Sequence, residues 1–355
     1  MGVKLKPLAE QVVVITGASS GIGLATARAA AKRGAAVVLA ARNGEELDRI
    51  AADLRAQGGR AAVCVADVAV EAEVERIAET AVAEFGGFDT WVNNAAAAAY
   101  AEEEVLPMAD HRRIFDVNYF GLVKGSLLAA EHLKARGGGA IVNVGSVLSD
   151  RTVILQGAYS ASKFAVKAFT DTLRMELERA GAPISVTLIQ PAGIATPYPE
   201  HARNFMDEPA RVPPILYAPD LVADAILFAA ANRKRALIVG GNGWLISLAG
   251  RFAPRLTDLV TEAVGVPGQT APGKPGDPAK ADNLHQPRDD GETEDGRDFY
   301  VRRQSLFLQA QKHPVAATAL ISAVTAAAMI AGSRDGRARV DALRRRTRRR
   351  DRAAA

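Results

Sequence analysis

The stretch VVVITGASSGIG, residues 12–23, decides the fold class of this chain. Its first half, VVVIT, is a continuous apolar run, the pattern of a strand that is covered on both faces. Three glycines follow at Gly17, Gly21 and Gly23, and an Ala-rich helical pattern then runs to about Gly34. A strand, a glycine-rich turn and a helix in this order predict the first βαβ unit of a dinucleotide-binding fold.

Each glycine of this turn has a physical reason. Gly17 allows a tight turn off the strand, Gly21 lets the backbone approach a diphosphate, and Gly23 lets the helix pack closely on the sheet. The N-terminus of the helix presents free N–H groups to the anion. We therefore expect the turn to hold a dinucleotide through Thr16, Gly17, Ser19, Ser20, Gly21, Ile22 and Gly23. The alternative is an ordinary strand-to-helix turn.

The pattern of a short apolar run followed by a helix repeats along the first 240 residues. Further strands are predicted at AAVVLA, AAVCVA, FDTWVNN, AIVNVGS, ISVTLIQ and ALIVGG, which makes seven with VVVIT. Strands that alternate with helices form right-handed crossovers and hence a parallel sheet. The sequence thus predicts an α/β fold with a Rossmann-type, doubly wound, seven-stranded parallel sheet.

Composition divides the chain into four parts. Residues 8–264 are expected to form the catalytic domain with the dinucleotide-binding fold. Residues 265–298 are rich in Pro, Gly, Asp, Glu and Lys, which predicts a disordered linker. A helical apolar segment is expected over 299–333, followed by an arginine-rich tail over 334–355. The C-terminal extension is therefore expected to be largely disordered or helical.

Charge and composition exclude several classes of protein. The net charge of +4 comes from the ten arginines of the tail, because the rest of the chain holds 34 basic and 37 acidic residues. This distribution argues against a nucleic-acid binder. A single cysteine, Cys64, and five histidines without metal-binding spacing predict no disulfide and no metal site. The N-terminus lacks the apolar core of a secretory signal, so we expect a cytoplasmic protein.

The second predicted strand ends in LAARN, which bears on the choice of cofactor. NAD-specific sites place a carboxylate at the position of Ala41, where it binds the ribose 2′-hydroxyl. Here Arg42 follows instead, and an arginine complements a 2′-phosphate. We therefore expect NADP(H) to be preferred, with NAD(H) as the alternative cofactor. The other interpretation is that Arg42 is a solvated surface residue.

The segment AYSASKFAVKAF places Tyr159 and Lys163 four residues apart on one face of a predicted helix. A lysine beside a phenol favours the phenolate and lowers its pKa. The pair is thus a candidate general acid and base near neutral pH. The spacing alone is weak, because it also occurs on ordinary helix surfaces.

Together these motifs resemble the short-chain dehydrogenase/reductase superfamily. TGASSGIG matches the family's TGxxxGxG motif, and NNAA at 93–96 matches its NNAG motif. Asp67, in VADV, matches the aspartate that contacts the adenine ring, and Asn118, in DVNYFG, matches the asparagine of the proton relay. Ser146 stands thirteen residues before Tyr159, which is the family spacing of the catalytic serine.

The resemblance runs from about Gln11 to Gly241. QPAGIAT resembles the PGxxxT loop over the nicotinamide. Two positions depart from the family pattern, since Ala96 and Ala192 stand where glycines are usual. Each adds one methyl group and removes no catalytic group, so we expect activity to survive.

The resemblance also implies a role for each matched residue. Ser146 would position a substrate carbonyl, Tyr159 would donate the proton, and Lys163 would bind the nicotinamide ribose. Asn118 would hold a water that replaces the proton. Besides the turn, Arg42, Tyr159 and Lys163, the expected cofactor contacts are Asp67, Val68, Asn94, Pro191, Ile194 and Thr196.

The expected activity is NADP(H)-dependent interconversion of an alcohol and a ketone or aldehyde by hydride transfer. The loop after Thr196 favours a hydrophobic small-molecule substrate, because it offers Tyr198, Phe205, Met206, Ile215, Leu216 and Tyr217. Arg203 and Arg211 are expected to bind an acidic group or to be solvated, and His201 is expected at the surface. The resemblance implies a homo-oligomer, a dimer or tetramer. Alternatives are a non-catalytic dinucleotide-sensing protein, an epimerase or another reductase on the same fold.

The uncharged run 314–333 is long enough for about 30 Å of helix, the thickness of a bilayer core. It is mainly alanine, and a single crossing would conflict with the arginines that follow it. Our hypothesis is association with a membrane surface through the C-terminal segment, with the arginines attracted to anionic lipid. The alternatives are a solvated tail or a helix packed on a partner subunit.

Overall fold

The computed structural model describes residues 3–271, 273, 275–276, 280–288, 291–294, 300–325 and 329. The chain divides into two compact units, Met1–Leu308 and Gln309–Ala355. The first unit contains every residue to which the sequence assigned chemistry, and it is described first.

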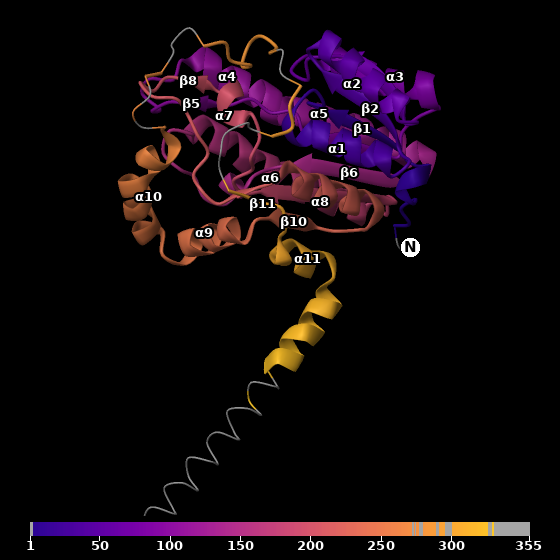
Figure 1. Ribbon diagram of the computed structural model, residues 1–355. Helices are drawn as coiled ribbons and strands as arrows, with labels where there is room; N and C mark the ends of the chain where they lie inside the picture. Colours follow the sequence, from indigo (N-terminus) through magenta and orange to yellow (C-terminus); the bar gives the residue numbers. More distant parts are fainter. Residues whose placement is uncertain are drawn as a thin grey trace, which may run out of the picture. The chain divides into compact units, whose positions relative to one another are not determined.

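A seven-stranded parallel sheet forms the centre of the first unit, with the strand order β10-β7-β6-β4-β1-β2-β3 (Figure 1). The strands are β1 Val12–Thr16, β2 Ala36–Ala41, β3 Arg60–Val65, β4 Thr90–Asn93, β6 Gly139–Val144, β7 Ile184–Pro191 and β10 Ala236–Val239. Every neighbouring pair is parallel. The predicted doubly wound sheet is therefore confirmed.

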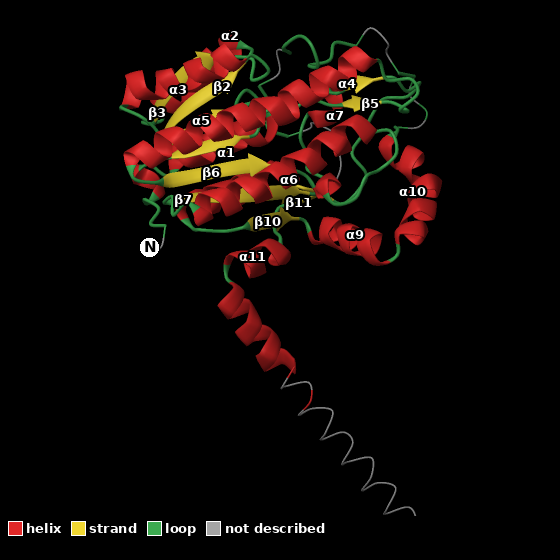
Figure 2. Cartoon of the chain, turned by 180° about the vertical axis from the view of Figure 1, so that it is seen from behind, coloured by secondary structure: helices red, strands yellow, loops and turns green. Residues whose placement is uncertain are grey.

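Helices cover both faces of this sheet (Figures 1 and 2). One layer consists of α1 Gly21–Lys32, α2 Gly44–Ala56 and α8 Pro219–Ala231, and the other of α3 Glu71–Phe85, α5 Gly121–Arg136 and α6 Gly157–Arg179. Val13 and Ile15 of β1 pack into the first layer, whereas Val12 and Val14 pack into the second. Alternate side chains of a strand point to opposite faces, which explains the continuous apolar run of β1.

Further helical elements lie outside these two layers. They are α4 Met108–Phe115, a π-helical segment Asp116–Phe120, α7 Tyr198–His201, α9 Gly241–Phe252, α10 Pro254–Gln269 and α11 Leu306–Lys312. Two parallel strand pairs join distant parts of the chain: β5 Ala99–Tyr100 with β8 Arg203–Asn204, and β9 Leu216–Tyr217 with β11 Val301–Arg302. Two 3₁₀ turns occupy Leu8–Glu10 and Val147–Ser149.

The structure differs from the disordered linker expected over 265–298. The first residues of that range complete α10, and the described residues 280–288 pack against the catalytic part of the chain. Leu284 is fully buried beside Ile114 and Val117. Composition underestimates order here because a few specific contacts outweigh the scarcity of apolar residues. The compact unit accordingly continues to Leu308, beyond the expected boundary at 264.

In the second unit, residues 314–325 are helical and expose the apolar side chains of Val315, Leu320, Ile321 and Val324. Among the residues described, no helix combines the length and the apolar character that crossing a membrane requires. The end of the run 314–333 and the arginine-rich tail 334–355 lie outside the described residues.

The burial of Leu308 tests whether the C-terminal part stabilises the catalytic unit. Leu308 is fully buried in the same core as α1 and α8, whereas Leu306, in the same helix, is 85% exposed. We expect Leu308→Ala to lower the free energy of unfolding by about 2–4 kcal/mol, because it leaves a cavity. Leu306→Ala is the matched control and should change it by less than about 0.5 kcal/mol. Urea unfolding of the full chain measures both, and equal effects would contradict the observed packing.

Candidate active site

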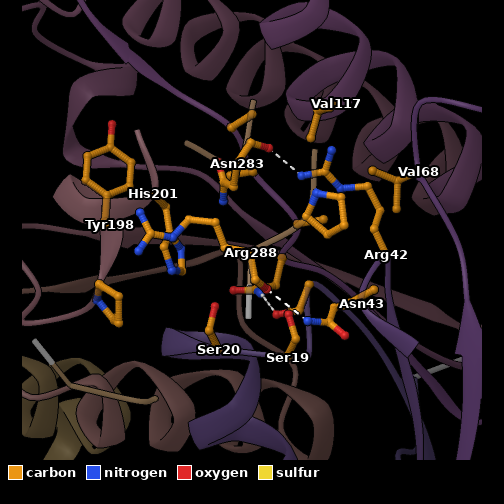
Figure 3. A pocket seen from close by; sticks show the side chains of 18 of the residues that line it. Ser19, Ser20, Arg42, Asn43, Val68, Val117, Tyr198, His201, Asn283 and Arg288 are labelled. Carbon is orange, nitrogen blue, oxygen red and sulfur yellow. Dashed lines mark hydrogen bonds between the residues drawn. The ribbon is translucent and has the colours of Figure 1, made fainter. Parts of the chain in front are cut away.

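A pocket lies at the carboxyl ends of the central strands, beside the point where the strand order reverses between β1 and β4. Crevices at such switch points are where doubly wound folds bind their ligands. The predicted cofactor residues that line it are Gly17, Ser19, Ser20, Ile22, Arg42, Asp67, Val68, Asn94 and Thr196 (Figure 3). Thr16, Gly21, Gly23, Tyr159, Lys163, Pro191 and Ile194 are absent from this lining.

The β1–α1 turn has the backbone conformation and the close packing that its glycines predict. Gly17 and Gly21 have φ values of +65° and +52°, in the left-handed region that favours glycine. A Cβ on Gly23 would stand 1.9 Å from the carbonyl oxygen of Gly17. Only glycine therefore permits this close approach of helix to turn.

Hydrogen bonds between Thr16 and Asn94 hold the turn in place. The Thr16 hydroxyl accepts from the backbone N–H of Asn94 at 3.0 Å, and the Asn94 amide donates to the Thr16 carbonyl at 2.9 Å. These bonds join the end of β1 to the chain after β4. Thr16 is thus a scaffold residue, while Asn94 both supports the turn and lines the pocket.

At the far end of the pocket, Asp67 is paired with Arg113, a residue that the sequence analysis missed. Arg113 donates to the Asp67 carboxylate at 2.6 Å. Burial alone would raise the pKa of Asp67, but the hydrogen bonds from Arg113 and Ala69 and the charges of Arg113 and Arg42 hold it below its ordinary value. Asp67 is therefore a carboxylate at neutral pH.

Arg42 lies beside this pair and is partly desolvated, which lowers its pKa. Its Nη2 donates to the carbonyl oxygen of Asn283, whereas its Nη1 is buried and finds no acceptor in the described part of the chain. A buried cationic N–H without an acceptor is costly and suits an anionic ligand. The residues present therefore fit a 2′-phosphate.

Ser146, Tyr159 and Lys163 come together outside the lining of this pocket, Ser146 just after β6 and the other two in the first turns of α6. Lys163 is 2% exposed, donates to the Val144 carbonyl at 2.9 Å, and its Nζ lies 5.6 Å from the centre of the Tyr159 ring. The hydroxyl of Ser146 accepts from the N–H of Leu148 at 3.0 Å, which fixes its position. The predicted Ser–Tyr–Lys set is thus adjacent in space.

The pKa of Tyr159 differs from the one expected from the sequence. Tyr159 is half-buried, and desolvation of its phenol raises the pKa of Tyr159 to about 12, despite hydrogen bonding with Ser146 that lowers it. Burial lowers the pKa of Lys163 to about 8. The expected lowering of the phenol pKa by Lys163 is therefore outweighed, because burial of the phenol opposes its charged form.

Asn118 lies in the π-helical segment and is 1% exposed. Its amide donates to the Ala97 carbonyl and to the Ser162 hydroxyl, both at 2.9 Å, and its oxygen accepts from the Ala97 N–H at 2.7 Å. Both amide hydrogens are therefore used in joining this segment to the loop after β4 and to α6.

The predicted substrate loop divides into several parts. Tyr198 and Met206 pack with Tyr159 in an apolar cluster, and the Tyr198 and Tyr159 rings lie 5.6 Å apart. Leu216 and Tyr217 are buried in β9, whereas Phe205 and Ile215 are exposed. Of the residues expected to line a substrate site, only those in the first half of the loop therefore lie beside Tyr159.

Three polar residues of this loop depart from expectation. His201, which was expected at the surface, is half-buried and lines the pocket. Arg203 pairs with Asp110 at 3.1 Å, and Arg211 donates to the carbonyls of Pro267 and Gly268. Both arginines are therefore engaged in structural contacts, since the α10 region and α4 supply acceptors that the loop sequence does not reveal.

The rest of the PGxxxT-like loop is structural as well. Pro191 ends β7, and Ile194 is buried and bridges to Tyr217. The methyl group of Ala192 lies against Gly240 and Gly243, where an added Cβ would come within 2.7 and 2.9 Å of it. Glycines at those two positions make room for the departure from the family pattern.

A family model described as short chain dehydrogenase matches residues 11–207. This chain belongs to the short-chain dehydrogenase/reductase family. It is an oxidoreductase that acts on CH–OH groups, and its cofactor is a nicotinamide dinucleotide.

Two relatives illustrate the range of the family. The oxidoreductase YxnA of Bacillus subtilis is 43% identical over 325 residues, which cover 91% of each chain. A cis-4-hydroxycyclohexanecarboxylate dehydrogenase of Sinomonas cyclohexanicum is 38% identical over 239 residues, which cover 65% of this chain and 93% of the relative. A match of 325 residues extends past residue 264 into the C-terminal part.

Solved structures of the family are similar as well. L-Sorbose reductase from Gluconobacter frateurii, complexed with NADPH and L-sorbose, is 27% identical with a TM-score of 0.58, over 68% of this chain and 98% of that one. A 3-ketoacyl-(acyl-carrier-protein) reductase from Brucella melitensis, complexed with NADH, is 30% identical with a TM-score of 0.59, over 66% and 99%.

The buried Lys163 predicts a pH dependence of stability. Its pKa is about 8 in the folded chain, against the ordinary lysine value of 10.5, so between these two pH values the unfolded chain binds more protons. Stability should therefore rise with pH in that range, by roughly 3 kcal/mol in total.

The difference in unfolding free energy between wild type and Lys163→Met, measured from pH 7 to pH 9.5, isolates this contribution. Wild type should gain stability relative to the variant as pH rises. Lys167→Met, one turn further along α6 where the side chain is 38% exposed, is the matched control and should show no such trend. A parallel course for wild type and Lys163→Met would contradict the burial of the ammonium group.

Proposed function

We propose that this protein is an NADP(H)-dependent oxidoreductase that interconverts an alcohol and a ketone or aldehyde on a hydrophobic small molecule. The observation that carries the proposal is the contact of Tyr159 with Lys163 and Ser146, beside an apolar cluster in which Tyr198 and Ala202 also line the pocket. Tyr159 is thus one side chain away from the space that we assign to the cofactor.

The mechanism follows from the state of these side chains. The dinucleotide supplies or accepts the hydride. With a pKa of about 12, Tyr159 is protonated at neutral pH and can donate its proton to a carbonyl oxygen. Ser146 hydrogen-bonds the same oxygen and orients it, and Lys163, whose pKa is about 8, supplies a proton to the site.

The preference for NADP(H) over NAD(H) is supported by Arg42 and by the absence of a carboxylate at Ala41. The unsatisfied Nη1 of Arg42 can bond to a 2′-phosphate, whereas a 2′-hydroxyl brings no charge to it. Relatives in the family bind either form, so the local residues are the stronger guide.

A neutral, hydrophobic substrate is supported by the surroundings of Tyr159. Tyr100, Leu155 and Ala202 are buried in the cluster around it, and Tyr198 and Met206 complete this wall. Arg203 and Arg211 are bonded elsewhere and do not offer a charge to an acidic substrate. The expected homo-oligomer is supported by exposed apolar side chains on α5 and α6, namely Leu127, Phe164 and Met175.

Tyr159→Phe tests the catalytic assignment. Removing the hydroxyl should lower turnover by at least about 100-fold while the NADPH dissociation constant changes less than a few-fold, since the phenol acts mainly in the transition state. Consumption of NADPH with a panel of ketones measures turnover, and fluorescence titration measures binding. Tyr300→Phe, at an 83% exposed position, is the control and should behave as wild type. Binding of NADPH by wild type without consumption across the panel would favour the dinucleotide-sensing alternative.

Arg42→Asp tests the cofactor preference. The carboxylate repels a 2′-phosphate and can accept from a 2′-hydroxyl, so the ratio of NADPH to NADH affinity should fall by at least about 10-fold. Arg28→Asp, an exposed arginine of α1, makes the same charge change away from the pocket and should leave the ratio unchanged. A wild type that prefers NADH, with a ratio insensitive to Arg42→Asp, would refute the preference.

A further inference from the structure

Residues 280–288, which we name the strap, form one wall of the dinucleotide pocket. Asn283, Pro287 and Arg288 line the pocket together with Arg42 and Asp67, although more than 200 residues separate them in sequence from those two positions (Figure 3). The strap comes from the part of the chain that follows the seven-stranded sheet, outside the range matched by the family model.

Contacts on two sides hold the strap across the pocket. Lys280 forms an ion pair with Glu200 of α7 at 2.6 Å, and His285 lies 2.8 Å from the buried Asp110 of α4. Asp282 pairs with Arg203 at 3.2 Å. The side chain of Leu284 is fully buried against the hydrophobic residues of α4 and its continuation. The strap is thus anchored by charge and by an apolar side chain.

On its inner side, the strap positions the side chains of the adenosine end. The carbonyl oxygen of Asn283 accepts from Arg42, and that of Leu284 accepts from Arg113 at 2.9 Å. Figure 3 shows the first of these bonds, together with the bond from Asn43 to the Arg288 carbonyl. The strap therefore fixes the arginine expected to meet a 2′-phosphate.

Two buried polar atoms at this place lack a partner in the part of the chain that the structure describes. They are the Nη1 of Arg42 and the side-chain oxygen Oδ1 of Asn283. One is a cationic donor and the other a neutral acceptor, and leaving either unsatisfied is costly. A ligand with an anion beside an N–H or O–H donor would satisfy both. The adenosine 2′-phosphate half of NADP(H) has this chemistry, with its phosphate next to hydroxyl and amino donors.

We propose that the strap completes the cofactor site and that Asn283 is a cofactor-binding residue. Its Oδ1 accepts a hydrogen bond from the adenosine half of the cofactor, while its main-chain carbonyl holds Arg42 toward the 2′-phosphate. The inference rests on the proposed NADP(H)-dependent function and extends the site to a segment beyond the family's matched range.

A competing outcome is that the chain near the strap blocks the cofactor. The N–H of Gly21, at the start of α1, donates to the carbonyl oxygen of Glu292 at 2.8 Å, so this stretch also reaches the turn expected to bind the diphosphate. If the strap competes with NADPH, weakening it should strengthen binding. If it belongs to the site, weakening it should reduce binding.

Substitution of Asn283 distinguishes the two by the direction of the effect. The loss of one hydrogen bond in Asn283→Ala should raise the NADPH dissociation constant by about 3- to 10-fold, measured by calorimetry. Asn283→Asp has the same shape but places a negative charge beside the 2′-phosphate, so it should weaken NADPH more than Asn283→Ala and more than it weakens NADH. Asn232→Ala, at the distant end of α8, is the matched control. Unchanged or tighter NADPH binding in both Asn283 variants would overturn the proposal.

Proteolysis provides a second readout that does not depend on turnover. Trypsin cleavage after Lys280 and Arg288, followed by mass spectrometry, should slow when NADPH is added to the wild-type chain, because a strap that contacts the cofactor is held more firmly. Faster or unchanged cleavage would count against the proposal. A wild type that binds neither NADPH nor NADH would instead refute the proposed function. Binding by wild type with no effect of Asn283 substitution would refute only the role of the strap.

Discussion

The hydrogen bonds between Thr16 and Asn94 are the contacts on which the rest of the site depends. They join the ends of β1 and β4, the two neighbouring strands at which the sheet reverses its winding direction. The crevice that opens there receives the glycine turn, and the close approach of Gly23 to Gly17 fixes where α1 begins. A small shift of either strand would misplace the turn relative to the pocket, because the turn has little conformational freedom.

The fold holds Tyr159 and Lys163 in surroundings that oppose the charged form of each side chain. Lys163 is buried with one carbonyl acceptor, that of Val144, and Tyr159 is held in its protonated form. Such an arrangement is unfavourable for stability, since burial opposes the charged lysine. It suits the proposed reaction, in which Tyr159 delivers a proton and Lys163 lies beside it. Perturbed ionisation beside a cleft is typical of functional sites.

Residues that follow the seven-stranded sheet add contacts to the core and to the pocket. Leu284 and Leu308 bury apolar surface in the catalytic unit, and β11 pairs with β9 beside the loop over the site. Residues that composition assigns to a linker thereby line the pocket beside Arg42 and Asp67. The pocket wall in this chain is consequently built from residues near both ends of the first unit.

The sequence by itself determined the seven-stranded sheet, the glycine turn and the pairing of Tyr159 with Lys163 on one helix face. These follow from local rules: apolar runs, positive φ angles and the four-residue spacing of a helix face. Ser146 was found only through the resemblance to the family. Only the tertiary structure decided that Arg113 pairs with Asp67 and that Asn283 meets Arg42. The latter contact joins residues 241 positions apart, and no local pattern encodes which distant segment reaches a given side chain. The pKa of about 12 at Tyr159 could likewise not be predicted from the sequence, because it depends on how far the folded chain buries the phenol.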